Sequence, residues 1–139
     1  KLFNKEDIRF RYRGSDFGKD LIVLSVVLEG KSSNKEDIEK VQKKFINQKK
    51  ESQPSKIKTC GSTFKNPKHK KAWSLIKESG CDKLSVGEAR ISEKHCNFFV
   101  NNGNATSNEI EELIKKVKNQ VLKKTGINLE LEIKVIGTK

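Results

Sequence analysis

The sequence predicts an α+β protein, and three patterns support that fold class. Two capped amphipathic segments indicate helices, and short alternating or continuous apolar runs indicate strands. The mixture of a hairpin, helices and a final strand, with no internal repeat, is typical of the α+β class. We expect residues 1–30 to end one structural portion as a β-hairpin, and residues 31–139 to form a small domain of helices packed on a sheet.

The first thirty residues contain two strand patterns. Asp7–Arg13 alternates apolar side chains with arginines, as a half-buried strand does. Leu21–Leu28 is almost continuously apolar, which suits a strand covered on both faces. The glycine- and aspartate-rich segment Gly14–Asp20 lies between them, so the sequence predicts a hairpin with its turn there.

A helix is predicted over 34–50. Ser33-Asn34-Lys35-Glu36 matches a capping box, and Pro54 prevents the helix from continuing much further. Apolar residues recur on one stripe of this helix, which should pack on the sheet: Ile38, Val41, Phe45 and Ile46.

The second half of the chain predicts two more helices and a final strand. Lys71–Ser79 is a short helical pattern stopped by Gly80, and 85–100 reads as loop with strand pieces. A second capping box opens a helix over 107–124 that ends at Gly126. Leu129–Val135 then alternates, which predicts a last strand.

The positive charge is concentrated in one segment. The chain carries a net charge of +12, and residues 31–71 hold thirteen basic against four acidic residues. Three interpretations stay open: a lysine-rich composition without a function, a local site for an anionic small molecule, and a small basic nucleic-acid-binding module. Only four of the thirty cations are arginine and only 6% of residues are aromatic, which counts against the nucleic-acid module.

The cysteines and the hydropathy place further bounds. Three cysteines without a CxxC pair indicate reduced thiols rather than a disulfide framework, and we expect no metal site. No apolar run approaches the ~18 residues that span a bilayer, so no membrane segment is expected. Because the chain opens at Lys1 without a methionine, we expect it to be a piece or a processed product of a longer protein.

Three polar features are not explained by the fold alone. The loop Cys60–Pro67 offers backbone N–H groups, hydroxyls and a lysine to an anion, although it could equally be a tight turn with a helix cap. Arg13 is the last residue of the alternating strand pattern, where a cation usually only faces solvent. Glu132 lies on the polar face of the last strand, where the same holds for a carboxylate.

Taken in chain order, these features resemble one family. The matching segments are Tyr12-Arg13-Gly14-Ser15 (YRxS), Gly61–Pro67 (GSxFKNP), Ile91–Phe98 (VSEKHANF), Asn101–Thr106 (NxGNAT) and Leu129–Gly137 (LEPEVRIIG). Together they resemble the C-terminal, substrate-binding part of bacterial UDP-N-acetylenolpyruvoylglucosamine reductases. The resemblance covers nearly all of the chain, and it departs from the pattern at Leu131, where the family has proline.

The resemblance implies an activity and its residues. These enzymes use FAD, reduced by NADPH, to convert a UDP-linked enolpyruvyl sugar into UDP-N-acetylmuramate for peptidoglycan. By similarity, Ser62 donates the proton, Arg13 binds the substrate carboxylate and Glu132 polarises the enolpyruvyl group. Positions matching substrate-binding residues are Tyr12, Lys65, Asn66 and His95.

The resemblance also implies a setting. By this resemblance, we expect the whole protein to be a bacterial, cytoplasmic, monomeric enzyme that binds a UDP-sugar, with no nucleic-acid or membrane partner. Residues 1–30 would then be the last strands of the FAD-binding portion. Because the family's glycine-rich flavin-binding segments have no match here, we expect the chain to be inactive alone. A non-catalytic relative that only binds UDP-sugars is a third interpretation, which the matching arginine, serine and glutamate make less favoured.

Overall fold

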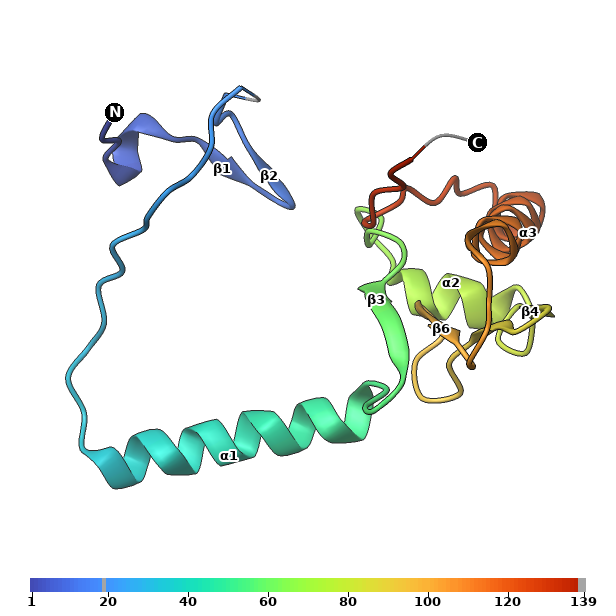
Figure 1. The fold of residues 1–139 in the computed structure, drawn as a ribbon, viewed down its shortest axis with the longest axis horizontal. Coiled ribbons are helices and arrows are strands. Elements are labelled where there is room, and N and C mark those ends of the chain that lie inside the picture. The colour runs from blue at the N-terminus through green and yellow to red at the C-terminus, as the bar shows by residue number, and fades with distance from the viewer. Residues whose placement is uncertain (19, 138–139) are drawn as a thin grey trace. The chain divides into compact units, whose positions relative to one another are not determined.

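A computed structural model describes residues 1–18 and 20–137 of the chain. The chain divides into two compact units, Lys1–Asn34 and Lys35–Lys139, and each is described by itself. Figure 1 shows the order of the elements from the N-terminus in blue to the C-terminus in red. The second unit combines helices with an antiparallel sheet, so the predicted α+β class is confirmed.

The first unit contains one short hairpin. A 3-10 turn at Lys5–Asp7 precedes β1 (Phe10–Arg11), which pairs antiparallel with β2 (Gly14–Ser15). The hairpin therefore turns at residues 12 and 13, earlier than predicted, and Lys19 of the predicted turn lies outside the described residues. The predicted strand at Leu21–Leu28 is wrong, because these residues are exposed and no described strand pairs with them. A continuous apolar run shows that two faces can be buried but does not provide the neighbouring strand.

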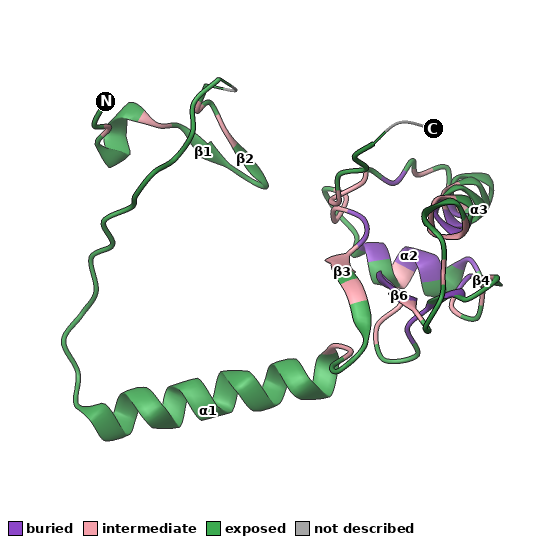
Figure 2. Cartoon of the chain, viewed as in Figure 1, coloured by how far each residue is buried: buried purple, intermediate pink, exposed green. Residues whose placement is uncertain are grey.

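The first long helix forms as predicted but does not pack as predicted. α1 spans Lys35–Ser52 and has no buried residue, as its uniformly exposed ribbon in Figure 2 shows. Its apolar stripe stays open to solvent, from 43% exposure at Ile46 to 62% at Phe45. The amphipathic pattern identifies an apolar face without identifying the segment that covers it. At its C-terminal end, the Lys94 ammonium donates to the carbonyl oxygen of Lys50 at 2.8 Å, which suits the negative end of a helix.

A four-stranded antiparallel sheet forms the centre of the second unit. Its order is β3-β6-β5-β4, with every neighbouring pair antiparallel. The strands are β3 (Lys58–Ser62), β4 (Ser85–Val86), β5 (Ala89–Ile91) and β6 (Phe98–Asn101).

Two helices enclose the core: α3 packs on β4 and β5, and α2 packs against α3. α2 spans Ala72–Glu78 and α3 spans Ser107–Thr125, and both appear with buried residues in Figure 2. Core side chains that are fully buried come from both helices, for example Leu75, Ile76, Leu113 and Val117. Phe64 joins this core from the loop after β3, and its ring meets Phe99 edge-on with centroids 5.8 Å apart. Burial of that ring anchors the loop to the sheet.

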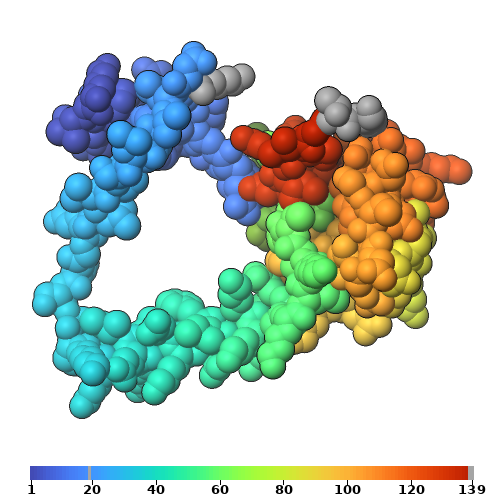
Figure 3. All heavy atoms as spheres, viewed as in Figure 1, coloured from blue at the N-terminus to red at the C-terminus, as the bar shows by residue number. Residues whose placement is uncertain are grey.

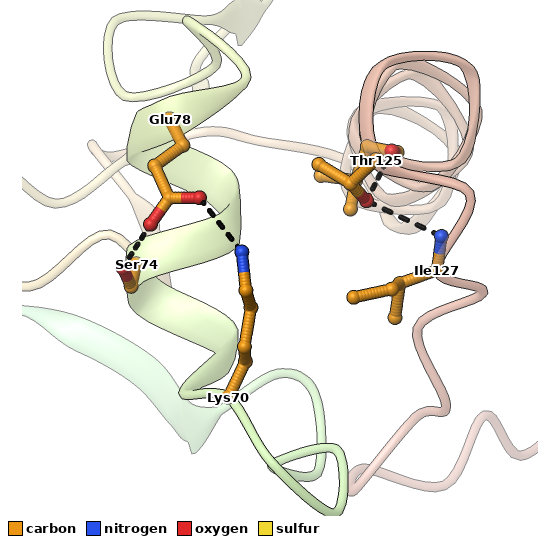
Figure 4. Close-up of polar contacts among 6 residues, drawn as sticks. Lys70, Ser74, Glu78, Thr125 and Ile127 are labelled. Atoms are coloured by element: carbon orange, nitrogen blue, oxygen red, sulfur yellow. Dashed lines mark hydrogen bonds and ion pairs between the residues drawn. The ribbon is translucent and has the colours of Figure 1, made fainter.

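Both helices end with side-chain contacts, drawn in Figure 4. Near the end of α2, Glu78 accepts hydrogen bonds from the Ser74 hydroxyl at 2.6 Å and from the Lys70 ammonium at 3.4 Å. At the end of α3, the Thr125 hydroxyl donates to the Val121 carbonyl at 2.8 Å and accepts from the Ile127 N–H at 3.2 Å. The Glu78 contacts join side chains along α2, whereas the Thr125 hydroxyl links the last turn of α3 to the backbone that follows it.

The start and stop of α3 match the sequence prediction. Thr106 caps the helix by accepting from the Glu109 N–H, and the Glu109 carboxylate accepts in return from the Thr106 N–H at 2.7 Å. Gly126 ends the helix in the left-handed region at φ 72°. Local capping chemistry therefore sets both boundaries.

The predicted last strand is mostly wrong. Of Leu129–Val135, only Leu131 forms a β-bridge, to Phe64, among the described residues. Leu129 is fully buried, whereas Val135 is 55% exposed. β3 ends at Ser62, and only the few residues after it lie beside this segment. A full strand at 129–135 would need a neighbouring strand of the same length for its backbone hydrogen bonds, and these few residues do not provide one. Residues 138 and 139 of the predicted domain lie outside the described residues.

Candidate active site

The loop that holds Ser62 begins inside β3. Gly61 has φ +84°, a conformation that side chains disfavour, and no atom lies within 4 Å of where its Cβ would be. Glycine is thus required here by the backbone angle and not by crowding. The register of β3 against β6 shifts between Thr59 and Ser62, which stands opposite Phe98. This irregularity ends the strand and leaves Ser62 half-buried at its tip.

One side of the loop is held by the loop before β6. The Thr63 N–H donates to the backbone oxygen of Asn97 at 2.7 Å. The Phe64 N–H donates to Oδ1 of Asn97 at 2.9 Å, and Nδ2 of Asn97 donates to the Phe64 oxygen at 2.8 Å. Three hydrogen bonds to one buried asparagine therefore fix the backbone of Thr63 and Phe64, the two residues after Ser62.

The other side of the loop is held by the C-terminal segment. The Glu132 N–H donates to the Thr63 oxygen at 2.9 Å, and the Lys65 N–H donates to the Glu130 oxygen at 2.8 Å. In Figure 3 the red C-terminal segment lies beside the light-green residues that follow β3. The structure thus brings the segments of Ser62 and Glu132 together, although they are far apart in sequence.

Glu132 is placed between solvent and protein. The residue as a whole is half-buried, and its Oε2 is buried from solvent. A carboxylate at such a boundary interacts more strongly with a bound group than one in water, because the local dielectric is lower. The prediction of a merely solvent-facing carboxylate is therefore less favoured by the geometry.

Two further predicted residues lie on the same loop. The ammonium of Lys65 forms an ion pair with Glu130 at 3.6 Å, with both side chains at least partly exposed. Oδ1 of Asn66 accepts from the Ala72 N–H at 3.0 Å, at the first residue of α2. Asn66 therefore caps α2 from outside the helix, so the loop and the helix start are one connected structure.

His95 lies two residues before the asparagine that holds the loop. Its Nδ1 accepts from the Asn97 N–H at 3.2 Å, and its ring meets Phe98 edge-on with centroids 4.8 Å apart. Burial lowers the pKa of His95, so the ring is held in its neutral form. Because Nδ1 accepts, the proton of the neutral ring is on Nε2.

Arg13 and Tyr12 belong to the first unit. Arg13 has φ 56°, a left-handed conformation that costs a non-glycine residue on the order of 1 kcal/mol. Its guanidinium carbon lies 5.5 Å from the centre of the Tyr12 ring. The prediction that Arg13 lies on a strand is wrong, since it occupies the hairpin turn between β1 and β2.

Asn97 is the residue that sequence reasoning missed. It belongs to a matching motif, but no local pattern assigns it a role. Its function becomes visible only through bonds to residues 33 positions away. The signal in the sequence is its place directly before the apolar run Phe98-Phe99-Val100.

The thiols and the possible metal ligands form no second site among the described residues. Cys60, Cys81 and Cys96 are free thiols, of which Cys60 is exposed. Within residues 1–18 and 20–137, no three His, Cys, Asp or Glu residues gather where they could hold a metal ion. None of the described helices is both long and apolar enough to cross a membrane.

Comparison with known proteins decides the family. Residues 53–136 match the family model described as UDP-N-acetylenolpyruvoylglucosamine reductase, C-terminal domain. The chain belongs to the UDP-N-acetylenolpyruvoylglucosamine reductase family. The matched range contains the loop at 61–67, His95 and Glu132, so most of the candidate site lies inside the family domain.

Individual reductases of this family agree. The chain is 50% identical to the enzyme of that name from Pelagibacter ubique over 91% of its own length and 43% of the relative's. It is 44% identical to the Rickettsia bellii reductase over 99% of its length and 45% of the relative's. The crystal structure of the Thermus caldophilus reductase superposes with a TM-score of 0.78 at 36% identity, covering 93% of this chain and 46% of that one. The chain thus spans less than half the length of these reductases, and the comparisons do not support the nucleic-acid-binding alternative.

Proposed function

We propose that this chain supplies the proton-donating and substrate-binding part of a bacterial, cytoplasmic, monomeric reductase. The reaction converts UDP-N-acetylglucosamine enolpyruvate into UDP-N-acetylmuramate. The observation that carries the proposal is the placement of Ser62 at the tip of β3, on a loop hydrogen-bonded to the segment of Glu132. A hydroxyl and a carboxylate on rigidly linked segments suit proton delivery to a carbon.

Each residue has a part that its chemistry allows. Reduction adds a hydride to the carbon distal to the substrate carboxylate, and a proton to the enolic carbon beside that carboxylate. Ser62 donates this proton through its O–H. A hydroxyl is a weak acid in water, so it needs a fixed position against a stabilised enolate. Arg13 would bind the substrate carboxylate and its developing charge, and Glu132 would polarise the enolpyruvyl group.

The substrate's nucleotide end meets the positive loop. Lys65 supplies a cation for the diphosphate, and Asn66 lies next to it on the loop that caps α2. Neutral His95 can donate from Nε2 to a sugar or phosphate oxygen. Tyr12, which is 63% exposed next to Arg13, offers a ring and a hydroxyl to the substrate.

The side chains of the site fit a hydride-donating cofactor bound beside them. Serine, glutamate, arginine and lysine move protons and stabilise charge, but none of them can donate a hydride. FAD, reduced by NADPH, supplies that hydride when bound. We assign no residue of this chain to FAD, whose site would lie mostly in the part of the reductases that this chain does not span. The chain alone is therefore expected to be inactive.

The decisive experiment uses the full-length reductase, that is, a protein as long as the relatives of this chain. Ser62→Ala should slow reoxidation of the reduced flavin by the enolpyruvyl sugar by at least ~10²-fold, as loss of a general acid does. Reduction of the flavin by NADPH should be unchanged, because it needs no proton at the sugar. Ser85→Ala, at the exposed first residue of β4, makes the same chemical change elsewhere and should react normally. Rapid-mixing absorbance measures both steps, and normal reoxidation in Ser62→Ala would refute the assignment.

A further inference from the structure

Asn97 does more than satisfy a buried loop. Its side-chain amide forms two hydrogen bonds with the backbone of one residue, accepting from the Phe64 N–H at 2.9 Å and donating to the Phe64 oxygen at 2.8 Å. This is how one strand pairs with another, with a side chain in place of the second backbone. Asn97 is only 4% exposed and Phe64 only 1%, so water does not replace these bonds.

Few side chains can make this pair of bonds. The amide of asparagine carries a donor and an acceptor on one short planar group, whereas an ionised aspartate only accepts and an apolar residue does neither. A buried backbone group left without its partner destabilises the fold, because it has lost its hydrogen bonds to water. The geometry therefore requires an amide of this length at position 97.

The peptide that Asn97 holds lies inside the candidate site. On the opposite side, Glu132 and Glu130 hold Thr63 and Lys65 through backbone hydrogen bonds. The loop is thus held on both sides by hydrogen bonds, those of Asn97 on one side and those of residues 130 and 132 on the other. If the bonds of the Asn97 side chain are removed, the backbone after Ser62 can shift relative to the segment of Glu132.

We propose that Asn97 is a positioning residue that keeps the Ser62 hydroxyl at the position relative to the Glu132 carboxylate that proton delivery requires. This inference rests on the proposed function of Ser62. Asn97 touches no reacting atom in this account and acts only through the Phe64 peptide. A displacement of about 1 Å at such a site can lower the rate on the order of 10²-fold.

Asn97→Asp is the sharpest test, because it keeps the shape and the acceptor and removes the donor. Asn101→Asp is the matched control. Asn101 also clamps a turn, accepting from the N–H groups of Gly103 and Ala105 and donating to the Ala105 oxygen, but that turn leads into α3. In the full-length enzyme, Asn97→Asp should lower kcat for the enolpyruvyl sugar by ~10–10²-fold. KM should change less than kcat, and Asn101→Asp should retain kcat.

The pH dependence separates positioning from general damage. In Asn97→Asp, the protonated form of the new carboxyl group again carries an O–H donor for the Phe64 oxygen. The kcat of this variant relative to wild type should therefore rise as the pH falls. An ionised carboxyl group at position 97 also raises the pKa of the neighbouring His95, so the same ratio is measured in a His95→Gln background, where only the new carboxyl group differs. A ratio that stays flat with pH, or a wild-type kcat in Asn97→Asp, would overturn the proposal.

Hydrogen exchange of backbone amides tests the hydrogen bonds between Asn97 and the loop without relying on turnover. In the full-length wild-type enzyme, the amides of Thr63 and Phe64 should exchange slowly, and in Asn97→Asp they should exchange faster than in Asn101→Asp. Rapid exchange of both amides in the wild type would overturn the inference even if no Asn97 variant folds. A wild-type enzyme that protects these amides but fails to reduce the enolpyruvyl sugar would instead refute the proposed function.

Discussion

The backbone N–H of Glu132 donates a 2.9 Å hydrogen bond to the carbonyl oxygen of Thr63, the residue that follows Ser62. This bond joins the last segment of the domain to the end of its first strand. Because it uses backbone atoms only, a change of the Glu132 side chain leaves the bond in place. The contributions of the loop position and of the carboxylate can therefore be separated by mutation.

Glu132→Gln should keep the loop geometry and lose only the negative charge. We expect flavin reoxidation by the enolpyruvyl sugar to slow by ~10²-fold or more, within the range for acid–base groups, with NADPH-dependent flavin reduction unchanged. Glu112→Gln makes the same change in an exposed ion pair with Lys116 on α3, and should react normally. Equal rates in the two variants, measured by stopped flow, would exclude a role for the Glu132 carboxylate.

Gly61→Ala should damage the site more than the fold. Its φ of +84° costs alanine about 1–2 kcal/mol, and no atom blocks the added methyl group. Gly126→Ala, at φ +72° with equally open space, should lose similar stability at the end of α3. Chemical denaturation should therefore show similar losses for both variants, whereas only Gly61→Ala should lose turnover. Normal turnover in Gly61→Ala would mean that the bend before Ser62 is not needed.

His95 should destabilise the domain when it is protonated. Burial lowers the pKa of His95 below its ordinary value of 6.5 in the folded state. The unfolded chain therefore takes up this proton at higher pH than the folded chain, and stability falls as the pH drops below about 6.5. NMR titration of the ring should show the lowered pKa. Denaturation at pH 7 and pH 5 should show a smaller loss for His95→Gln, and an equal loss would contradict this account.

Glu78 should contribute stability that disappears at lower pH. The hydrogen bond from the Ser74 hydroxyl, together with Lys70, lowers the pKa of Glu78 below 4.5. A carboxylate whose pKa is lowered by folding stabilises the fold above its unfolded pKa, and this contribution is lost as the pH falls through the folded pKa. Glu78→Gln should therefore flatten the acid side of the stability curve below about pH 4.5. Acid titration followed by circular dichroism measures this, and an unchanged acid limb would argue against the contact.

The helices were predictable because their signals are local. The capping box at Thr106 and the glycine at 126 lie within the helix they delimit, so the boundaries of α3 could be predicted from adjacent residues. α1 begins at Lys35, one residue after the predicted start, and ends at Ser52, two residues after the predicted end. What could not be predicted for α1 was its packing, because an apolar stripe does not specify a partner.

The strands were less predictable because pairing is not local. Leu21–Leu28 and Leu129–Val135 both have strand-like patterns, yet neither forms a full strand, since a ladder requires a neighbour over its whole length. For the site, the family motif singled out Ser62, Lys65 and Asn66 on one loop. It could not reveal that Asn97 holds this loop, because that role consists of three hydrogen bonds across a long sequence separation.

The hydrogen bonds that hold the loop after Ser62 from both sides also affect the order in which the chain folds. The residues after Ser62 have no secondary structure of their own and depend on Asn97, 33 positions further on, and on the segment after α3. Contacts of high sequence separation close large loops and tend to form after local helices. The loop should therefore acquire its final shape late, when both distant segments have arrived. Weakening its hydrogen bonds should speed unfolding while leaving the folding rate nearly unchanged.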